Sequence, residues 1–466
     1  MSSDYGVEYT PAISTPTHLS NVSFASLRST VQYIRLTWVD FINNTRYKVI
    51  PYAYFAKVLS AQRPGIHVPK VALGMVEVTV AEGFSASGEY LYVPDMSTLR
   101  MCPYETGTAS VMGWFEEKEP TPGKTLSAPL CPRSTLRRVV EEARVKAKVN
   151  FLVGFETEFI LLSSTNPIVP VNQHGWNNST ALPSGSVEAK VMRHIADALK
   201  EGGVELQMYH AEVAPGQYEV VTAPLPPVEA ADALVFTREV IVNVAATYGL
   251  RATLAPRLFM DNCGSSSHTH ISVHPTTGPA DTPYLAPYET SFLSGLLEHL
   301  PAIQAFTTPL SASYARMLDG IWSGGTYVCW GTYNKEAPVR VCNAGSPIAR
   351  NFEVKCVDGL ANPHLALAAM LAAGANGVEQ SSPLTIKDLS DVGAAQLSPE
   401  ARLAHGITTR MSLTWQEARQ KLVEDRVLCS ALDPELVEAY LSTNLTLEKW
   451  VESDKEMSQR KLVEHY

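Results

Sequence analysis

The chain has 466 residues, of which 45% are hydrophobic and 18% charged, so it can bury the cores of two or three domains. Its formal net charge of −10 argues against binding to nucleic acid or to an anionic membrane, because both need clustered lysine and arginine. No apolar run approaches the roughly 20 residues that span a bilayer, and no secretory signal is visible. Seven scattered cysteines without a CxxC pair favour a reducing compartment, so we expect a cytoplasmic protein.

The first third of the chain predicts a small domain behind a tail. Residues 1–25 are rich in Ser, Thr and Pro, which predicts a flexible tail. Short strand-like segments with one helix near 53–61 predict a β-rich domain over residues 26–120. A Pro- and Gly-rich stretch at 118–132 predicts the boundary. The remainder, 125–466, is predicted to form one large domain.

The larger part alternates between helical and strand-like patterns. Ser134 is predicted to be the N-cap of its first helix. A short apolar run predicts a buried strand over 151–162, and Pro215-Gly216 predicts the turn of a hairpin within 205–221. Periodicity and glycine stop signals predict the remaining elements: helices 187–200, 229–248, 291–305 and 363–378, two strand-like pieces within 251–273, an irregular region at 309–342, a strand at 351–357, and mostly helical sequence thereafter.

Two carboxylates interrupt the buried strand FLVGFETEFILL. Side chains two apart on a strand share a face, so Glu156 and Glu158 are predicted to project together. Burying two anions side by side is unfavourable unless a cation lies between them, and Mg²⁺ or Mn²⁺ prefers carboxylate oxygens. The alternatives are an exposed sheet face or a Glu pair neutralised by Arg or Lys.

Two later motifs also bring potential metal ligands together. In AEVAPGQYEVV, Glu212 and Glu219 are expected on opposite arms of the hairpin, within reach of one ion. In SSSHTHISVH, His268 and His270 are expected to share a strand face, as metal ligands or phosphate donors often do. A solvated hairpin and a structural histidine pair are the alternatives.

Basic residues near the end of the predicted sheet offer anion-binding groups. In NFEVKC, Glu353 and Lys355 share a face, although a salt-bridged sheet face is the alternative. The sequence has no GxxxxGK[ST] loop, no GxGxxG after a strand and no GxSxG elbow, so a nucleotide would be bound through metals and basic side chains. The candidate clamps for phosphate or carboxylate, each of which could be ordinary surface charge, are Arg316, Lys335, Arg340 and Arg350.

These motifs occur in the order typical of the glutamine synthetase family, as GFETEF, EVAPGQYE, CGSSSHTH and FEVKCVDGLANPHLALAAMLAAG. The chain resembles that family over about residues 31–379, and its divergent glutamine synthetase-like branch most. The resemblance implies an α+β fold with a β-grasp-like N-terminal domain and a large catalytic α/β domain built on an antiparallel sheet. It also implies a homo-oligomeric ring, a decamer or dodecamer, whose active sites are shared between subunits.

Residue roles follow from the resemblance, motif by motif. It implies a substrate-side metal, Mg²⁺ or Mn²⁺, bound by Glu156, Glu212 and Glu219. It implies an ATP-side metal bound by Glu158, His268 and Glu353. Further implied positions contact the acid, the phosphates or the nucleotide: Arg316, Lys335 and Arg340 as catalytic residues, and Ser272, Arg340, Arg350, Gly264 and Lys355 as binding residues.

The departures from the family pattern fall in the half of the site that holds glutamate and ammonia. Cys263 replaces the usual Asn before the loop glycine, and Asn351, Lys355 and Lys335 replace arginines. In the family, a glutamate on a flap shields the acyl phosphate, and this glutamate has no clear counterpart in DGIWSGGTYVCWG. The acidic DGSS-type motif of the family's N-terminal domain, which helps to hold ammonium, is also missing. Because Lys cannot form the bidentate bonds of Arg, a different acid or a different pose is expected.

We therefore expect an ATP-dependent carboxylate–amine ligase. It would activate glutamate or a related small-molecule acid as an acyl phosphate and form an amide with a small-molecule amine. One alternative is an ordinary glutamine synthetase acting on glutamate and ammonia. The other is a catalytically inactive relative that serves as a scaffold or nucleotide sensor.

Overall fold

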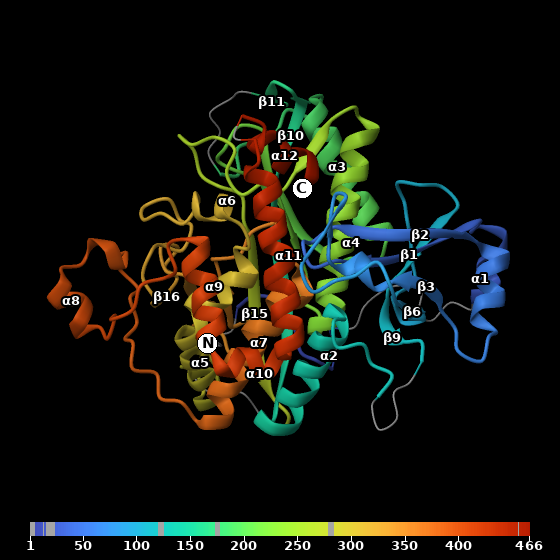
Figure 1. Cartoon of the computed structure of the whole chain (residues 1–466). Helices are drawn as coiled ribbons and strands as arrows, with labels where there is room; N and C mark the ends of the chain where they lie inside the picture. The colour runs from blue at the N-terminus through green and yellow to red at the C-terminus, as the bar shows by residue number, and fades with distance from the viewer. Residues whose placement is uncertain are drawn as a thin grey trace.

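The computed structural model describes residues 5–12, 14, 24–119, 125–172, 178–277, 284–454 and 456–466. In these ranges a small β-rich part lies beside a large part that combines a mixed sheet with many helices (Figure 1). The fold is α+β, as the sequence predicts. None of the helices in the described ranges is long and apolar enough to cross a membrane.

The small part contains two packed sheets. One has the order β2-β1-β8-β7 and the other the order β3-β6-β9, with a short β4-β5 hairpin beside them. The sequence YIRLTWV of β1 is buried at six successive positions, because the strand is covered on both faces. The elements are β1 Tyr33–Val39, β2 Thr45–Pro51, α1 Tyr52–Leu59, β3 Ile66–Pro69, β4 Met75–Val76, β5 Thr79–Val80, β6 Glu89–Pro94, β7 Arg100–Met101, β8 Thr108–Val111 and β9 Gly113–Glu117.

A large sheet, antiparallel apart from its last strand pair, carries the acidic motifs. Its order in the described chain is β12-β13-β10-β15-β18-β17-β16, and β11 and β14 also pair with β10. Strand β10 (Val149–Thr165) is longer than predicted and buried along most of its length, because neighbours flank it on both edges. The other strands are β11 Ile168–Pro170, β12 Leu206–Ala211, β13 Gln217–Thr222, β14 Arg251–Thr253, β15 Ser267–Pro275, β16 Trp330–Thr332, β17 Val339–Cys342 and β18 Asn351–Val354.

Helices surround this sheet. The Ala-rich α7 is buried over most of its length, and α8 projects from the side of the molecule opposite the small part (Figure 1). The helices predicted between 187 and 378 are all present within a few residues of their expected bounds. The helices are α2 Pro132–Glu142, α3 Val187–Glu201, α4 Pro227–Thr247, α5 Pro287–Thr307, α6 Ser311–Tyr314, α7 Pro363–Gln380, α8 Pro399–Ala404, α9 Trp415–Glu424, α10 Arg426–Leu432, α11 Pro434–Glu452 and α12 Ser458–His465.

Two local expectations need correction. Ser134 lies inside α2, whose N-cap is Cys131, because Pro132 has the fixed φ that suits the first helical position. The predicted tail is not wholly loose, since Tyr5 and Tyr9 make hydrogen bonds to the large part. Most of the other tail residues lie outside the described ranges.

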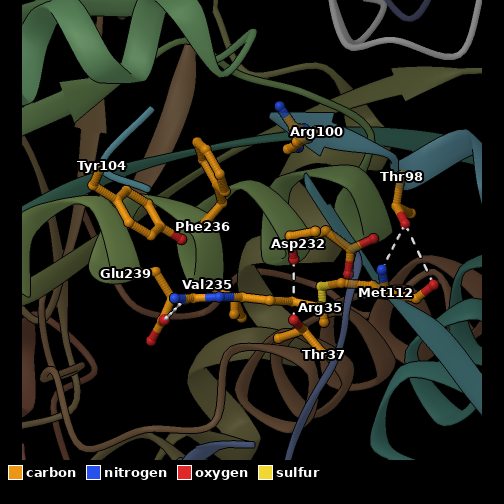
Figure 2. Close-up of a pocket in the computed structure, with 11 residues that line it drawn as sticks. Arg35, Thr37, Thr98, Arg100, Tyr104, Met112, Asp232, Val235, Phe236 and Glu239 are labelled. Atoms are coloured by element: carbon orange, nitrogen blue, oxygen red, sulfur yellow. Dashed lines mark hydrogen bonds and ion pairs between the residues drawn. The ribbon is translucent and has the colours of Figure 1, made fainter. Parts of the chain in front are cut away.

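Polar contacts join the small part to α4 and to the end of α3. Figure 2 shows Arg35 of β1 running alongside α4, where its guanidinium lies 3.9 Å from the Glu239 carboxylate. Arg100 of β7 donates to the Gly202 carbonyl, 2.9 Å away. The packed core is continuous across the two parts. The domain boundary near 120–125 therefore stays a prediction, and residues 120–124 lie outside the described ranges.

A buried charge cluster crosses the same junction. Arg133 of α2 makes bidentate contact with Asp232 of α4, at 2.9 to 3.1 Å, and bonds Asp95 of the small part at 2.8 Å. His364 of α7 lies 2.9 Å from Asp232. Burial alone would raise the pKa of Asp232, but Arg133 and His364 outweigh it and lower that pKa to about 2.

We predict that Asp232→Asn lowers the free energy of unfolding by about 3 kcal/mol, because it leaves buried Arg133 short of a counter-charge. The double variant Arg133→Met/Asp232→Asn should recover much of the loss, which urea titration would measure. A lowered folded pKa stabilises the protein above the unfolded value of about 4, and this contribution disappears as the pH falls toward 2. A single variant as stable as the wild type at pH 7 would contradict the assignment.

Candidate active site

Strand register brings the acidic motifs together on one face of the large sheet. Glu156 and Glu158 are two residues apart on β10 and therefore point to the same side. Glu156 lies opposite His268 of β15 in the register. Glu158 lies opposite Glu219 of β13. The face that the sequence predicts is thus formed by three adjacent strands.

Two histidines and Glu353 surround Glu156. His268 Nδ1 lies 2.8 Å from one Glu156 carboxylate oxygen, and His270 Nε2 lies 3.0 Å from the other. Glu353 of β18 lies opposite His270 in the register, with its carboxylate 3.4 Å from His268 Nδ1. Burial alone would raise the pKa of Glu156, but the two histidines outweigh it and hold that pKa well below its ordinary value. Glu156 is therefore ionised at neutral pH.

Two cationic side chains neutralise Glu353. This fully buried carboxylate accepts hydrogen bonds from Arg340 of β17 and, at 2.9 Å, from Lys355 Nζ. Lys355 Nζ also lies 3.4 Å from His268 Nε2. Burial alone would raise the pKa of Glu353, but Lys355 and the histidines lower it well below the usual range. A charged carboxylate is thus maintained inside the core.

A second acidic group lies around the β12–β13 hairpin. His210 of β12 lies 3.2 Å from Glu219 and 3.3 Å from Glu212. Glu158 accepts a hydrogen bond of 3.0 Å from Gln217. Burial and mutual repulsion among the carboxylates raise the pKa of Glu158 and that of Glu219 to about 7. Hydrogen bonds to Glu212 and Glu219 raise the pKa of His210 to about 10.

The two carboxylates of β10 each have partners from both expected sets. Glu156 contacts the two histidines, and it also belongs with Glu219 and His268 to one set of neighbouring ligand atoms. Glu158 lies opposite Glu219, and its carboxylate is also 3.9 Å from His268 Nδ1. Motif order alone could not assign these partners, because they depend on the register between β10 and its neighbours.

The site fits divalent metal ions. Its candidate ligands are carboxylate oxygens and imidazole nitrogens, which suit Mg²⁺ or Mn²⁺ bound beside phosphates. The two raised carboxylate pKa values indicate a surplus of buried negative charge, which a cation would relieve. Among the described residues, three overlapping sets have ligand atoms within 4.8 Å of one another: Glu156, Glu219 and His268; Glu156, His270 and Glu353; and His210, Glu212 and Glu219.

A cavity of about 690 Å³ opens from these ligands. Glu156, His210, Glu219 and His270 line one end. Residues further from the carboxylates along the same strands line the other end, among them Leu152. A volume of this size lies within the range that encloses small ligands and cofactors.

Two of the predicted clamps are already bonded inside the protein. Arg316 is fully buried, donating to the Ser266 hydroxyl and to the Lys355 carbonyl. Arg350 makes a bidentate ion pair with Glu289 of α5, at 2.7 and 3.0 Å, although it also lines the cavity. Both arginines therefore make structural contacts, and their predicted roles in binding stay predictions.

The other predicted residues differ in their position relative to the cavity. Ser272 lines the cavity, and its hydroxyl lies 2.8 Å from His274 Nε2. Gly264 accepts a hydrogen bond from Gln217, and a Cβ at this position would lie only 2.5 Å from the Pro256 carbonyl. Lys335 is exposed in the turn between β16 and β17.

A glycine-rich flap, residues 319–326, lies next to the site. Glu336 accepts backbone hydrogen bonds from Gly320 and Trp322, and Gly324 packs so closely that a Cβ there would meet Lys355 at 3.4 Å. Trp322 has a φ of 60° and is 54% exposed. A bulky residue in this conformation is strained, and such strain is common at ligand clamps.

Sequence reasoning missed His210 and Gln217 as members of the site. Both lie on strands of the hairpin, one before Glu212 and one before Glu219. His210 is two residues before Glu212, so the same period-two argument that united Glu156 and Glu158 could have found it. Gln217 depends on cross-strand contact with Glu158, which sequence alone does not give.

Comparisons with known proteins agree with this geometry. Residues 129–463 match the model of the family described as "Glutamine synthetase, catalytic domain". The chain is 36% identical to Protein fluG of Emericella nidulans over 94% of its own length, and it spans 49%, about half, of that protein. It is 32% identical to the gamma-glutamylpolyamine synthetase GlnA3 of Streptomyces coelicolor, over 89% of each chain. The structure of a GmaS–ADP complex superposes with a TM-score of 0.78 at 22% identity, covering 96% of this chain and 100% of that one.

The fold is that of the GmaS structure, and the family match and the relatives indicate an ATP-dependent ligase of the glutamine synthetase type. The chain belongs to the glutamine synthetase family.

The raised carboxylate pKa values predict that cation binding depends on pH. Glu158 and Glu219 hold protons below about pH 7, and a cation must displace them. The affinity for Mg²⁺ or Mn²⁺ should therefore rise by about tenfold per pH unit per proton released between pH 6 and 7, and level off above it. Calorimetric titration at pH 6, 7 and 8 measures this, and Glu219→Gln should flatten the dependence. Equal affinities at pH 6 and 8 would contradict it.

Proposed function

We propose that this protein activates a small-molecule carboxylic acid, glutamate or a close relative, with ATP and joins it to an organic amine as an amide. The single observation that carries the proposal is the paired ligand set at one end of the 690 Å³ cavity. Carboxylates on both sides of one cavity can hold cations on a nucleotide's phosphates, which is what transfer of a phosphoryl group to a carboxylate needs.

In this proposal, two cations are bound by two separate groups of ligands. Glu156, His268 and Glu353 would hold one, with His270 beside them. Glu158, Glu212 and Glu219 would hold the other. Bound cations would neutralise phosphate charge as the acid becomes an acyl phosphate. Family membership supports this proposal, as does the buried surplus of negative charge.

The basic side chains of Arg340 and Lys355 have distinct roles in this proposal. Arg340 and Lys355 hold Glu353 ionised and fix its orientation beside His268. Arg340 is only partly buried, which supports a contact with a phosphate as well. The flap backbone next to Lys355 would exclude water from the acyl phosphate, which hydrolysis would otherwise destroy.

An organic amine, rather than ammonia, is favoured by the flap. Asp319, the acidic residue of residues 319–326, already accepts hydrogen bonds from Thr326. Exposed Trp322 offers an apolar and cation-attracting surface instead. A relative whose name describes a γ-glutamylpolyamine synthetase supports the same class of acceptor. Ordinary glutamine synthetase activity is the competing possibility.

The assembly and the location are also part of the proposal. Family membership supports a homo-oligomeric ring, a decamer or dodecamer, with active sites shared between subunits. The seven cysteines are all free thiols, which supports a reducing compartment such as the cytoplasm.

Glu353→Gln should lower ATP turnover at least about 100-fold. It removes the negative charge of a proposed cation ligand and leaves Arg340 and Lys355 without their carboxylate partner. Size-exclusion chromatography should show an unchanged assembly. Glu142→Gln, on the exposed side of α2, is the matched control and should keep full turnover. Near-normal turnover in well-folded Glu353→Gln would refute the assignment of this carboxylate.

Ligation assays with mass detection of amides test the substrate class. Primary amines and polyamines should give kcat/KM values at least about tenfold above that of ammonia, with glutamate as the acid. Trp322→Ala should lower kcat/KM for organic amines and change that for ammonia little, whereas Trp322→Phe should retain the preference. If glutamate and ammonia are the best pair, with a turnover of about 10 s⁻¹, the protein is an ordinary glutamine synthetase.

A further inference from the structure

The N-terminal segment of residues 5–9 lies against the cavity, although it is far from the metal ligands in the sequence. Gly6, Val7 and Tyr9 contribute to its lining. Tyr5 and Tyr9 are bonded to two different elements of the large part, so the segment is fixed at both ends.

The first attachment is the loop between β17 and β18. The Tyr5 backbone nitrogen donates to the Ser346 hydroxyl at 3.3 Å, and that hydroxyl donates to the Tyr5 carbonyl at 2.8 Å. The Tyr5 hydroxyl lies 2.6 Å from the Tyr333 hydroxyl. Ser346 is fully buried, so the contact holds the segment against a fixed part of the fold.

The second attachment is the start of β12. The Tyr9 hydroxyl donates to Glu205 at 3.0 Å and accepts from Gln207 Nε2 at 3.0 Å. In the sheet, β12 is separated from β18 by β13, β10 and β15. A segment bonded to both β12 and the β17–β18 loop therefore crosses the cavity above these three strands.

Both attachments lie at the end of the cavity remote from the metal ligands. On β12, His210 faces Glu219, whereas Leu206 lies opposite Thr222, at the other end of the strand pair. On the opposite side, Arg340 pairs with Glu353, and the β17–β18 loop begins two pairs further along the register, after Cys342 and Asn351.

The cavity is long enough to separate phosphates from a base. Along β10, Leu152 lies four residues from Glu156, which corresponds to about 13 Å at 3.3 Å per residue. Leu152 pairs with Ser272, so apolar and hydroxyl groups line the remote end, together with the Glu205 carboxylate that Tyr9 bonds. The cavity retains about 690 Å³ with the segment in place, so the segment covers the space without filling it.

We infer that residues 5–9 form a cover over the base of the bound nucleotide and complete that end of the binding site. The inference rests on the proposed function, in which ATP phosphates lie at the metal ligands. The Tyr5 backbone and the hydroxyls of Tyr5 and Tyr9 hold the cover in place, and Gly6 lets it pass closely. Its φ is 91°, and a Cβ would lie 3.1 Å from that of Ala349.

Nucleotide binding by full-length variants tests the cover. Tyr5→Ala/Tyr9→Ala removes both hydroxyl attachments, and Gly6→Val strains the backbone and presses on Ala349. The matched control is Tyr54→Ala, an exposed tyrosine of α1. The probes are ATP and inorganic tripolyphosphate, each with Mg²⁺ and without acid or amine, measured by calorimetry.

Both cover variants should raise the Kd for ATP by about tenfold, while the Kd for tripolyphosphate, which has no base, should stay within about twofold. The control should match the wild type for both probes. Unchanged ATP affinity in both cover variants, tighter ATP binding, or equal weakening of the two probes would each overturn the inference. A wild-type protein that binds neither probe would instead overturn the proposed function, and the cover with it.

Discussion

The site depends on the burial of Glu158 and Glu219, which face each other across β10 and β13 in the interior of the protein. Burial is the largest cause of their raised pKa values, and nearby carboxylates add to it. A pKa raised from 4.5 to about 7 corresponds to about 3 kcal/mol against the ionised form of a carboxylate. Packing in a long central strand must offset this cost. A cation between the carboxylates would relieve it, so the cost to the fold and the affinity of the site have one origin.

The carboxylates on the other side of the site show the opposite pKa shift. Glu156 and Glu353 are also buried, but histidines, Arg340 and Lys355 compensate them within the protein. Their pKa values are therefore lowered rather than raised. One side of the cavity is neutralised by side chains, and the other side lacks enough positive charge of its own.

Much of this could be predicted from the sequence, and the limits have physical causes. The strand with Glu156 and Glu158 was predictable, because period-two alternation is a local property. Their partners were not, because register is set by packing between strands that are distant in the chain. Burial of Arg316 and the ion pair of Arg350 were missed for the same reason. Tyr5 and Tyr9 lie in a polar, Pro-containing stretch without periodicity, so only tertiary contacts reveal that they are fixed.

The alternation of β10 has a practical consequence. Glu156 and Glu158 occupy one face, while Phe155, Thr157 and Phe159 on the other face are packed into the interior. A slip of one residue would place carboxylates in the hydrophobic interior and aromatic rings in the cavity. Misregistered chains should therefore be unstable rather than partly active. Specific activity would then be proportional to the fraction of correctly folded chains. A low value in a purified sample would indicate a mixture of folded and misfolded chains.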